Sequence, residues 1–120
     1  MFTSARPFSG FAVDDISVAK EFYGEMLGMP VEEDHGMLTL QIGDGHRILA
    51  YPKEEHTPAT FTILNFRVDD IDAAVEDLVG RGIVFQRYEG TDEKGISRGD
   101  GPPIAWFNDP AGNILSVIEE

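Results

Sequence analysis

The chain has 120 residues, of which 42% are hydrophobic and 26% are charged, as in an ordinary globular domain with a core of its own. Nine basic and 22 acidic side chains give a formal net charge of −13, which repels phosphate backbones and argues against a nucleic-acid partner. The chain has no cysteine, no run of about 18 apolar residues and no apolar stretch near its start. We therefore expect an acidic, cytoplasmic protein without disulfides and without a membrane partner.

The first half of the chain predicts one strand, one helix and three further strands. Apolar side chains recur every four residues at Val18, Phe22 and Met26, which is typical of a helix. Asp15 precedes this stripe and can cap the helix, and Gly28 can end it. Strands are expected at 8–13, 30–33, 37–42 and 47–51, with a tight turn at Asp44-Gly45.

After a polar joint at 53–59, the same order of elements is expected again. The second helix should cover residues 70–79 and end at the glycines that follow. Its inner face should hold Ile71, Ala74, Val75 and Leu78. Strands are expected at 61–68, 83–87, 104–107 and 113–118.

The two halves share a sequence repeat. Residues 11–16 read Phe-Ala-Val-Asp-Asp-Ile and return at residues 66–71 as Phe-Arg-Val-Asp-Asp-Ile, at an offset of 66 − 11 = 55. Residues 48–51 align with 114–117 at an offset of 66, so about eleven extra residues (66 − 55) fall in the loop at 89–103, either a functional lid or surface elaboration. We predict an α+β fold with two βαβββ modules, about 8–52 and 61–120, in a single domain spanning 1–120.

Side chains alternate along strands, which assigns two faces to the first strand of each module. The apolar face, expected to carry the helices, holds Phe11, Val13, Leu64, Phe66 and Val68. The opposite face holds Phe8, Gly10, Ala12, Ile63, Asn65 and Arg67. If the sheets curve toward each other, Asn65 and Arg67 could orient a small ligand in an otherwise apolar cleft; the alternative is a solvated face.

Two motifs in this arrangement resemble the vicinal oxygen chelate superfamily, which includes glyoxalase I, extradiol dioxygenases and bleomycin-resistance proteins. The first is Phe22-Tyr23 followed by Leu27-Gly28-Met29, and the second is Phe-Asn-Asp-Pro-Ala-Gly-Asn at 107–113. The resemblance covers essentially the whole chain. It implies two βαβββ modules whose sheets form a cup-shaped half-barrel with the helices outside, either within one chain or exchanged in a homodimer.

Members of this superfamily usually hold a divalent metal ion that polarises the substrate. The resemblance places its ligands at Phe8 and Ile63 on the first strands and at Ala50 and Ser116 on the last strands. None of these is a normal ligand for such a cation. The histidines, at spacings that match no ligand pattern, are His35, His46 and His56. We therefore expect neither a metal nor another cofactor.

Two functions of different classes remain open. The first is a metal-free homodimer, similar to the bleomycin-resistance branch, that sequesters a cationic or aromatic small molecule; the net charge either attracts such a ligand or only aids solubility. The second is a lyase or isomerase acting on a small oxygenated substrate, with Arg67 stabilising an enolate and Tyr51 or a carboxylate carrying a proton. A regulatory partner-binding domain is a third possibility.

The ligand-binding candidates follow from the first two of these hypotheses, and no catalytic residue is assigned. Trp106, the one tryptophan, either packs in the core or a dimer interface or offers a stacking platform to a ligand. The full set of candidates is Phe8, Ala50, Ile63, Asn65, Arg67, Trp106 and Ser116.

Overall fold

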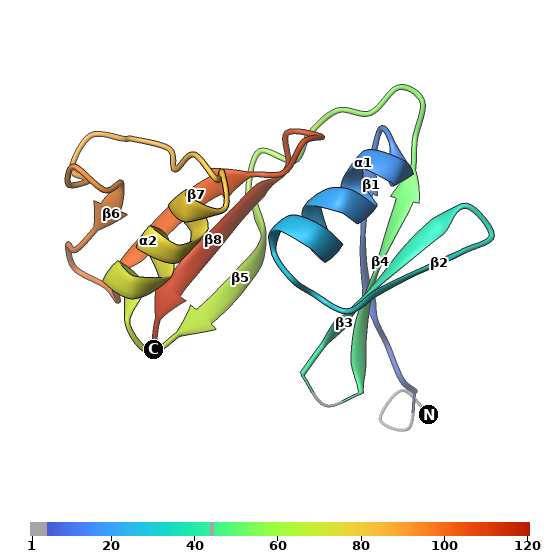
Figure 1. Ribbon diagram of the computed structural model, residues 1–120, viewed down its shortest axis with the longest axis horizontal. Coiled ribbons are helices and arrows are strands. Elements are labelled where there is room, and N and C mark those ends of the chain that lie inside the picture. Colours follow the sequence, from blue (N-terminus) through green and yellow to red (C-terminus); the bar gives the residue numbers. More distant parts are fainter. Residues whose placement is uncertain (1–4, 44) are drawn as a thin grey trace. The chain divides into compact units, whose positions relative to one another are not determined.

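The computed structural model describes residues 5–43 and 45–120. The chain divides between His56 and Thr57 into two compact units, each with one helical segment and one four-stranded mixed sheet (Figure 1). This confirms the predicted α+β fold built from two similar modules. The cup expected between the two sheets stays a prediction.

The sheet of the first unit has the strand order β1-β4-β3-β2. Its strands are β1 (Ser9–Val13), β2 (Val31–Asp34), β3 (Met37–Ile42) and β4 (His46–Pro52). β1 runs parallel to β4, and the remaining pairs are antiparallel. One face of this sheet is buried through Phe11, Val13, Leu38, Leu40, Ile48 and Ala50. The tight turn predicted before β4 includes Asp44, which lies outside the described residues.

The first helical segment begins as α1 (Ile16–Lys20) and widens into the π-helical η2 (Glu21–Met26). Asp15 caps it as predicted, because its side chain accepts a hydrogen bond from the backbone N–H of Val18 at 3.2 Å. The N–H of Leu27 donates to the carbonyl of Phe22, five residues back, as a π turn requires. Val18, the first residue of the apolar stripe, is 43% exposed. The buried residues of this segment are Ala19, Phe22 and Tyr23.

The second unit repeats this plan with the strand order β5-β8-β7-β6. Its elements are β5 (Thr62–Val68), α2 (Ile71–Gly80), β6 (Ile96–Ser97), β7 (Ile104–Asn108) and β8 (Ile114–Glu119). Asp70 caps α2 by accepting from the N–H of Ala73 at 3.1 Å, so the repeated Asp-Asp pair ends in a helix cap in both units. The helix buries Ile71 and Val75, as its periodicity predicted, over a core that includes Phe85, Ile96, Ala105, Phe107, Leu115 and Val117.

The strand predicted at 83–87 is wrong. Its alternation is real, because Ile83 and Phe85 are buried and Val84 is exposed, but only Phe85 pairs, in an isolated bridge to Phe107. After Gln86 the chain leaves the sheet and returns as β6, where Ile96 pairs with Ala105. The edge of the five-residue β7 is thus shared by two short segments. We call residues 87–95, which loop out between them, the 87–95 excursion.

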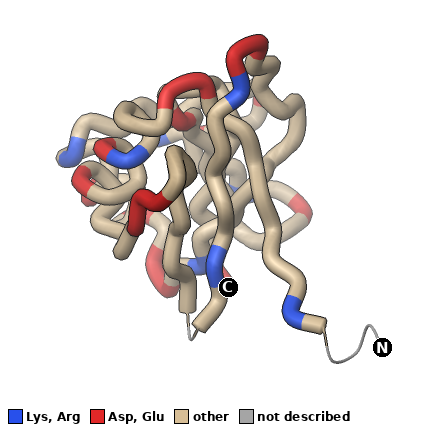
Figure 2. The backbone as a smooth tube through the Cα atoms, turned by 90° about the vertical axis from the view of Figure 1, so that its right-hand side faces the viewer, with Lys and Arg blue, Asp and Glu red and all other residues tan. Residues whose placement is uncertain are grey.

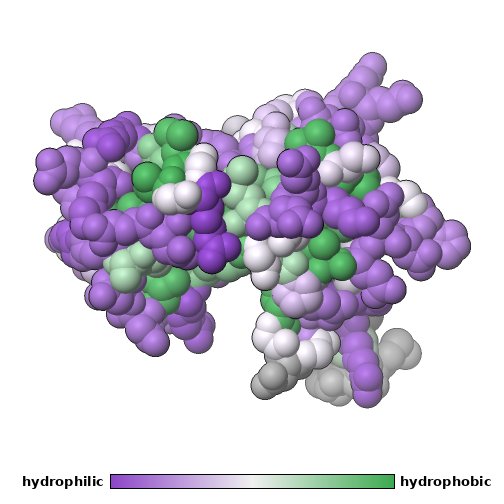
Figure 3. Space-filling view, in the orientation of Figure 1, coloured by the Kyte–Doolittle hydropathy of each residue, from purple (hydrophilic) through white to green (hydrophobic). Residues whose placement is uncertain are grey.

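Charged side chains are spread over the surface of the chain. In Figure 2 the acidic segments recur at several separate places along the tube. Hydrophilic residues cover most of the face seen in Figure 3, with smaller hydrophobic areas between them. Among the described residues, no helix is long and apolar enough to cross a membrane.

Candidate functional site

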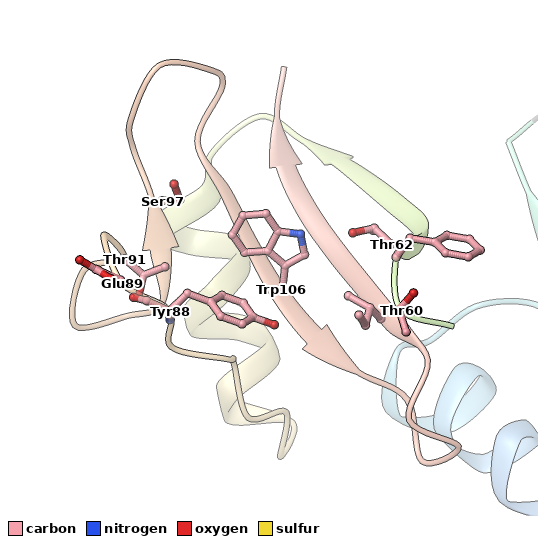
Figure 4. Close-up of a pocket in the computed structure, with 9 residues that line it drawn as sticks. Thr60, Thr62, Tyr88, Glu89, Thr91, Ser97 and Trp106 are labelled. Carbon is pink, nitrogen blue, oxygen red and sulfur yellow. Dashed lines mark hydrogen bonds between the residues drawn. The ribbon is translucent and has the colours of Figure 1, made fainter. Parts of the chain in front are cut away.

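A row of three predicted site residues crosses the second sheet on the face opposite α2. Asn65 of β5 lies in register with Ser116 of β8, and Ser116 lies in register with Trp106 of β7. The hydroxyl of Ser116 donates a hydrogen bond to Oδ1 of Asn65. Figure 4 shows Trp106 on this face with α2 behind the sheet. The row therefore joins a polar pair, in which Ser116 is buried and Asn65 is exposed, to an indole ring.

A pocket of about 340 Å³ opens beside this row, and we call it the Trp106 pocket. The ring of Tyr88 meets the indole of Trp106 edge to face, with centroids 5.6 Å apart and planes at 80°. Most of the other lining side chains carry hydroxyl groups, and one carries a carboxylate (Figure 4). The complete lining is Thr60, Phe61, Thr62, Tyr88, Glu89, Thr91, Ser97, Trp106 and Ile114.

Backbone contacts hold Tyr88 against the pocket. Thr91 donates from its N–H and from its hydroxyl to the carbonyl of Tyr88, at 3.1 and 2.7 Å, and its Oγ1 accepts from the N–H of Tyr88 at 3.1 Å. Thr91 also forms an isolated antiparallel β-bridge with Ser97. Sequence reasoning missed Tyr88 and Thr91 as site residues, because only the detour of the chain out of the β7 edge brings them to Trp106.

A second polar pair lies on the same edge. Gln86 donates from its backbone N–H to the carbonyl of Trp106 at 2.8 Å and from its side chain to Oδ1 of Asn108. Nδ2 of Asn108 in turn donates a hydrogen bond to the carbonyl of Gly112 at 3.2 Å. These bonds tie the start of the excursion to the strand that carries the indole.

The position of Ala50 corrects the predicted alignment. Gly10 pairs with Leu49, and its counterpart in the second unit, Asn65, pairs with Ser116. Leu49 therefore matches Ser116 at an offset of 116 − 49 = 67, one more than the sequence suggested. The predicted match of Ala50 to Ser116 is wrong, because Ala50 is fully buried on the core face. A one-residue slip moves every side chain of a strand to the other face.

Of the predicted site residues, Trp106 alone lines the Trp106 pocket. Phe8 is half exposed, and the guanidinium of Arg47 lies 4.4 Å from the centre of its ring. Ile63 falls in an irregularity of the pairing between β5 and β8. Arg67 has a side chain that is 76% exposed, and its Nε lies 3.3 Å from a carboxylate oxygen of Glu120.

The four positions at which the resemblance places metal ligands do not fit a divalent cation. Phe8, Ile63 and Ala50 have hydrocarbon side chains. Ser116 has the one oxygen among them, and its hydroxyl donates to Asn65. A neutral hydroxyl beside three hydrocarbons is a poor donor set for a hard or borderline cation. Elsewhere in residues 5–43 and 45–120, no three His, Asp or Glu side chains gather closely enough to hold an ion.

A cluster of four charged residues, which we call the Asp72 cluster, joins the second unit's helix to its loop. It consists of Asp72, Asp92, Lys94 and Arg98. Hydrogen bonds from Arg98 and Lys94 lower the pKa of Asp72, and the N–H of Ile96 lowers the pKa of Asp92. The same hydrogen bonds to Asp72 raise the pKa values of Lys94 and Arg98. All four groups are therefore charged at neutral pH.

The paired units and their open sheets define a fold of the vicinal-oxygen-chelate type. The chain belongs to the Glyoxalase/Bleomycin resistance protein/Dioxygenase superfamily, whose family model matches residues 8–117. No curated protein matches the chain significantly.

Solved structures with the same fold span nearly the whole chain at low sequence identity. A glyoxalase family protein from Enterococcus faecalis is 21% identical, with a TM-score of 0.73 over 99% of this chain and 100% of that chain. TnmS3, an antibiotic binding protein from Streptomyces sp. CB03234, is 22% identical, with a TM-score of 0.70 over 97% of each chain. The fosfomycin resistance protein FosX from Listeria monocytogenes is 13% identical, with a TM-score of 0.73 over 98% and 93%.

Proposed function

We propose that the protein binds a flat aromatic small molecule in the Trp106 pocket without a metal ion, and that it acts by sequestering this compound. The observation that carries the proposal is the corner formed by the rings of Trp106 and Tyr88, bordered by hydroxyl groups. Ligand pockets typically combine such apolar surfaces with a few polar groups that fix orientation. The volume of about 340 Å³ lies within the range of small-molecule sites.

Charge favours a cationic ligand over an anionic one. Glu89 is the one ionisable carboxylate among the lining residues, and the chain as a whole carries −13. A positive ligand is attracted by this field, and its charge can also lie over the face of an indole. Support from relatives is general: the superfamily name includes bleomycin resistance proteins, and one structure with this fold is an antibiotic binding protein.

The test uses two dyes of opposite charge, ethidium and anilinonaphthalene sulfonate, titrated against the protein by dye fluorescence. Ethidium is expected to bind saturably at one site per chain and more tightly than the sulfonate. Replacing Trp106 with leucine should weaken ethidium binding at least about tenfold, because the stacking surface is lost. Trp106→Phe should lose about threefold or less, since a ring remains.

The matched control is Val84→Ala, which trims a highly exposed side chain of the same unit away from the pocket. This variant should bind ethidium as the original protein does, and thermal melts should show that all variants are folded. Equal affinity of Trp106→Leu and Val84→Ala would contradict the proposed site. Ethidium binding that requires one equivalent of a divalent cation, removed by a chelator and restored by the ion, would contradict metal independence.

We also propose a homodimer in the cytoplasm. Four strands, β1, β2, β5 and β6, lie at the ends of the two sheets, and unpaired strand edges favour association. The lack of cysteine in the chain suits a reducing compartment. Native mass spectrometry should detect a species of twice 13.2 kDa, about 26 kDa, that carries no stoichiometric metal. A monomer at micromolar concentration would contradict the dimer.

A lyase or isomerase is not favoured by a specific observation. Arg67, the residue assigned to enolate stabilisation, is largely exposed and forms an ion pair with Glu120. The alternative thus lacks a cation in the pocket to stabilise a developing negative charge.

A further inference from the structure

We infer that Asp72 is a positioning residue of the Trp106 pocket. Through Arg98 and Lys94, this helix residue holds the 87–95 excursion against the second unit and thereby fixes the wall that Tyr88 and Thr91 form. The consequence for ligand affinity rests on the proposed function, whereas the consequence for the wall itself does not.

The excursion and β6 supply one side of the pocket. Tyr88, Glu89, Thr91 and Ser97 line it from this segment, and Tyr88 sets the angle of the aromatic corner. Sheet pairing holds the segment where it leaves β7 at Gln86 and where it returns at Ile96. Between these points only Thr91 pairs, in an isolated bridge to Ser97, so other contacts are needed to hold this part against the helix.

Side chains of the Asp72 cluster make such contacts from the helix. Nη2 of Arg98 donates to both carboxylate oxygens of Asp72, at 2.8 and 2.9 Å, and Nζ of Lys94 donates to Oδ1 at 3.2 Å. Glu76, one turn further along α2, lies 3.8 Å from the same ammonium group. Asp72 lies in the first turn of α2, which is anchored to the core by Ile71 and Val75. A loop with no regular structure is thus fastened to a rigid element.

Asp92 connects Arg98 to the turn next to the pocket by hydrogen bonds. Its Oδ2 accepts from Nε of Arg98 at 3.3 Å, while Oδ1 accepts from the N–H groups of Lys94 and Ile96, both at 2.9 Å. The N–H of Asp92 donates to the carbonyl of Ile96, also at 2.9 Å. The preceding residue, Thr91, bonds Tyr88 three times over. Hydrogen bonds therefore link the helix to Asp92, and the peptide bond to Thr91 and the bonds of Thr91 to Tyr88 continue this link to the aromatic corner.

The strength of this fastening depends on salt. The side chains of Asp72, Lys94 and Arg98 are each about two-fifths exposed, so dissolved ions reach them. Screening is substantial at distances beyond about 10 Å at 0.1 M salt and beyond about 3 Å at 1 M. Exposed pairs contribute little to global stability, but a network in which one arginine joins the carboxylates of Asp72 and Asp92 restrains a loop whose opening costs little.

The test measures the free protein by two readouts that need no ligand. Quenching of Trp106 fluorescence by acrylamide, which is uncharged, reports the exposure of the only tryptophan. Hydrogen exchange at the amide of Thr91 reports opening of the wall. For Asp72→Asn and Arg98→Gln, exchange at Thr91 should rise about two- to fivefold, and quenching should increase with it. The double variant should add little to either single change, because both remove the same contact.

Asp77→Asn and Arg81→Gln are the matched controls. They break the exposed ion pair between Asp77 on the same helix and Arg81 at its C-terminal end, at 3.2 Å. Neither should change either readout. In the original protein, raising NaCl from 0.1 to 1 M should reproduce the effect of Asp72→Asn, and that variant should respond little to the added salt. Unchanged exchange at Thr91 in both Asp72→Asn and Arg98→Gln would overturn the inference.

The ligand arm compares ethidium affinity in Asp72→Asn and Asp77→Asn at one salt concentration. Both variants lose one negative charge, so the general attraction for the cation falls equally. Weaker binding in Asp72→Asn alone is expected, by about two- to fivefold. A looser wall with no ethidium binding in any variant would sink the proposed function and leave the positioning role intact. Ethidium binding to a protein whose wall does not loosen in Asp72→Asn would contradict the positioning role and leave the proposed function intact.

Discussion

Replacing Asp109 with alanine is expected to lower the free energy of unfolding by about 3 kcal/mol and the melting temperature by about 10 °C. Asp109 is only 4% exposed, in the turn between β7 and β8. Its Oδ1 accepts from the N–H groups of Ala111 and Asn113, at 3.0 and 2.8 Å, and Oδ2 accepts from Nδ2 of Asn113 at 3.1 Å. Alanine would leave three donors without this acceptor in a buried turn, and each costs free energy.

The effect should reach the pocket as well as the core. Oδ1 of Asn113 accepts from the N–H of Ala59 at 3.4 Å, just before the pocket residues Thr60 and Thr62. Urea denaturation should give the change in unfolding free energy for Asp109→Ala. Asp100→Ala, which removes an exposed carboxylate from a loop, is the control and should change stability by less than about 0.5 kcal/mol. Similar midpoints for these two variants would show that the turn does not depend on the carboxylate.

Features that depend on neighbouring residues were predictable from the sequence. The cap at Asp15 follows from an Asp placed directly before an apolar stripe, and the structure confirms it. Asp70, expected as the first residue of the second helix, caps that helix in the same way. The row of Asn65, Ser116 and Trp106 was predictable in part, because alternation along each strand is a local property. The hydrogen bond between Asn65 and Ser116 required the register of two strands about fifty residues apart, which no local pattern contains.

Register and competition between strands explain what could not be predicted. Counting along the chain gave an offset of 66 between the two units, whereas the strand pairing gives 67. Because of this one-residue error, Ala50 was predicted as a site residue in place of Leu49, although Ala50 lies on the core face of its strand. Residues 83–87 alternate like a strand, yet the edge of β7 next to Ala105 pairs with Ile96 instead. The chain loops out at 87–95 because Ile96 pairs with β7 there, and this loop forms one wall of the Trp106 pocket. No local sequence pattern therefore predicts Tyr88 and Thr91 as wall residues.

A second large effect is expected from replacing Gly95 with alanine, where the excursion returns to the sheet. Gly95 has φ +85°, and an added Cβ would lie 2.9 Å from the backbone oxygen of Gln86 and 3.2 Å from Cβ of Phe85. A left-handed alanine costs about 1–2 kcal/mol, and the overlap with backbone adds about as much again. We expect a loss of about 3 kcal/mol in unfolding free energy, measured in urea.

Gly90→Ala separates the two causes, because Gly90 has a similar φ of +91° in the same excursion but nothing within 4 Å of an added Cβ. This variant should lose only about 1 kcal/mol, the cost of the backbone conformation alone. Gly95→Ala should in addition push Gln86 away from the carbonyl of Trp106, so its ethidium affinity should fall while that of Gly90→Ala changes little. If both variants lost the same stability, the close approach of Gly95 to Gln86 would not be what joins the excursion to the strand that carries the indole.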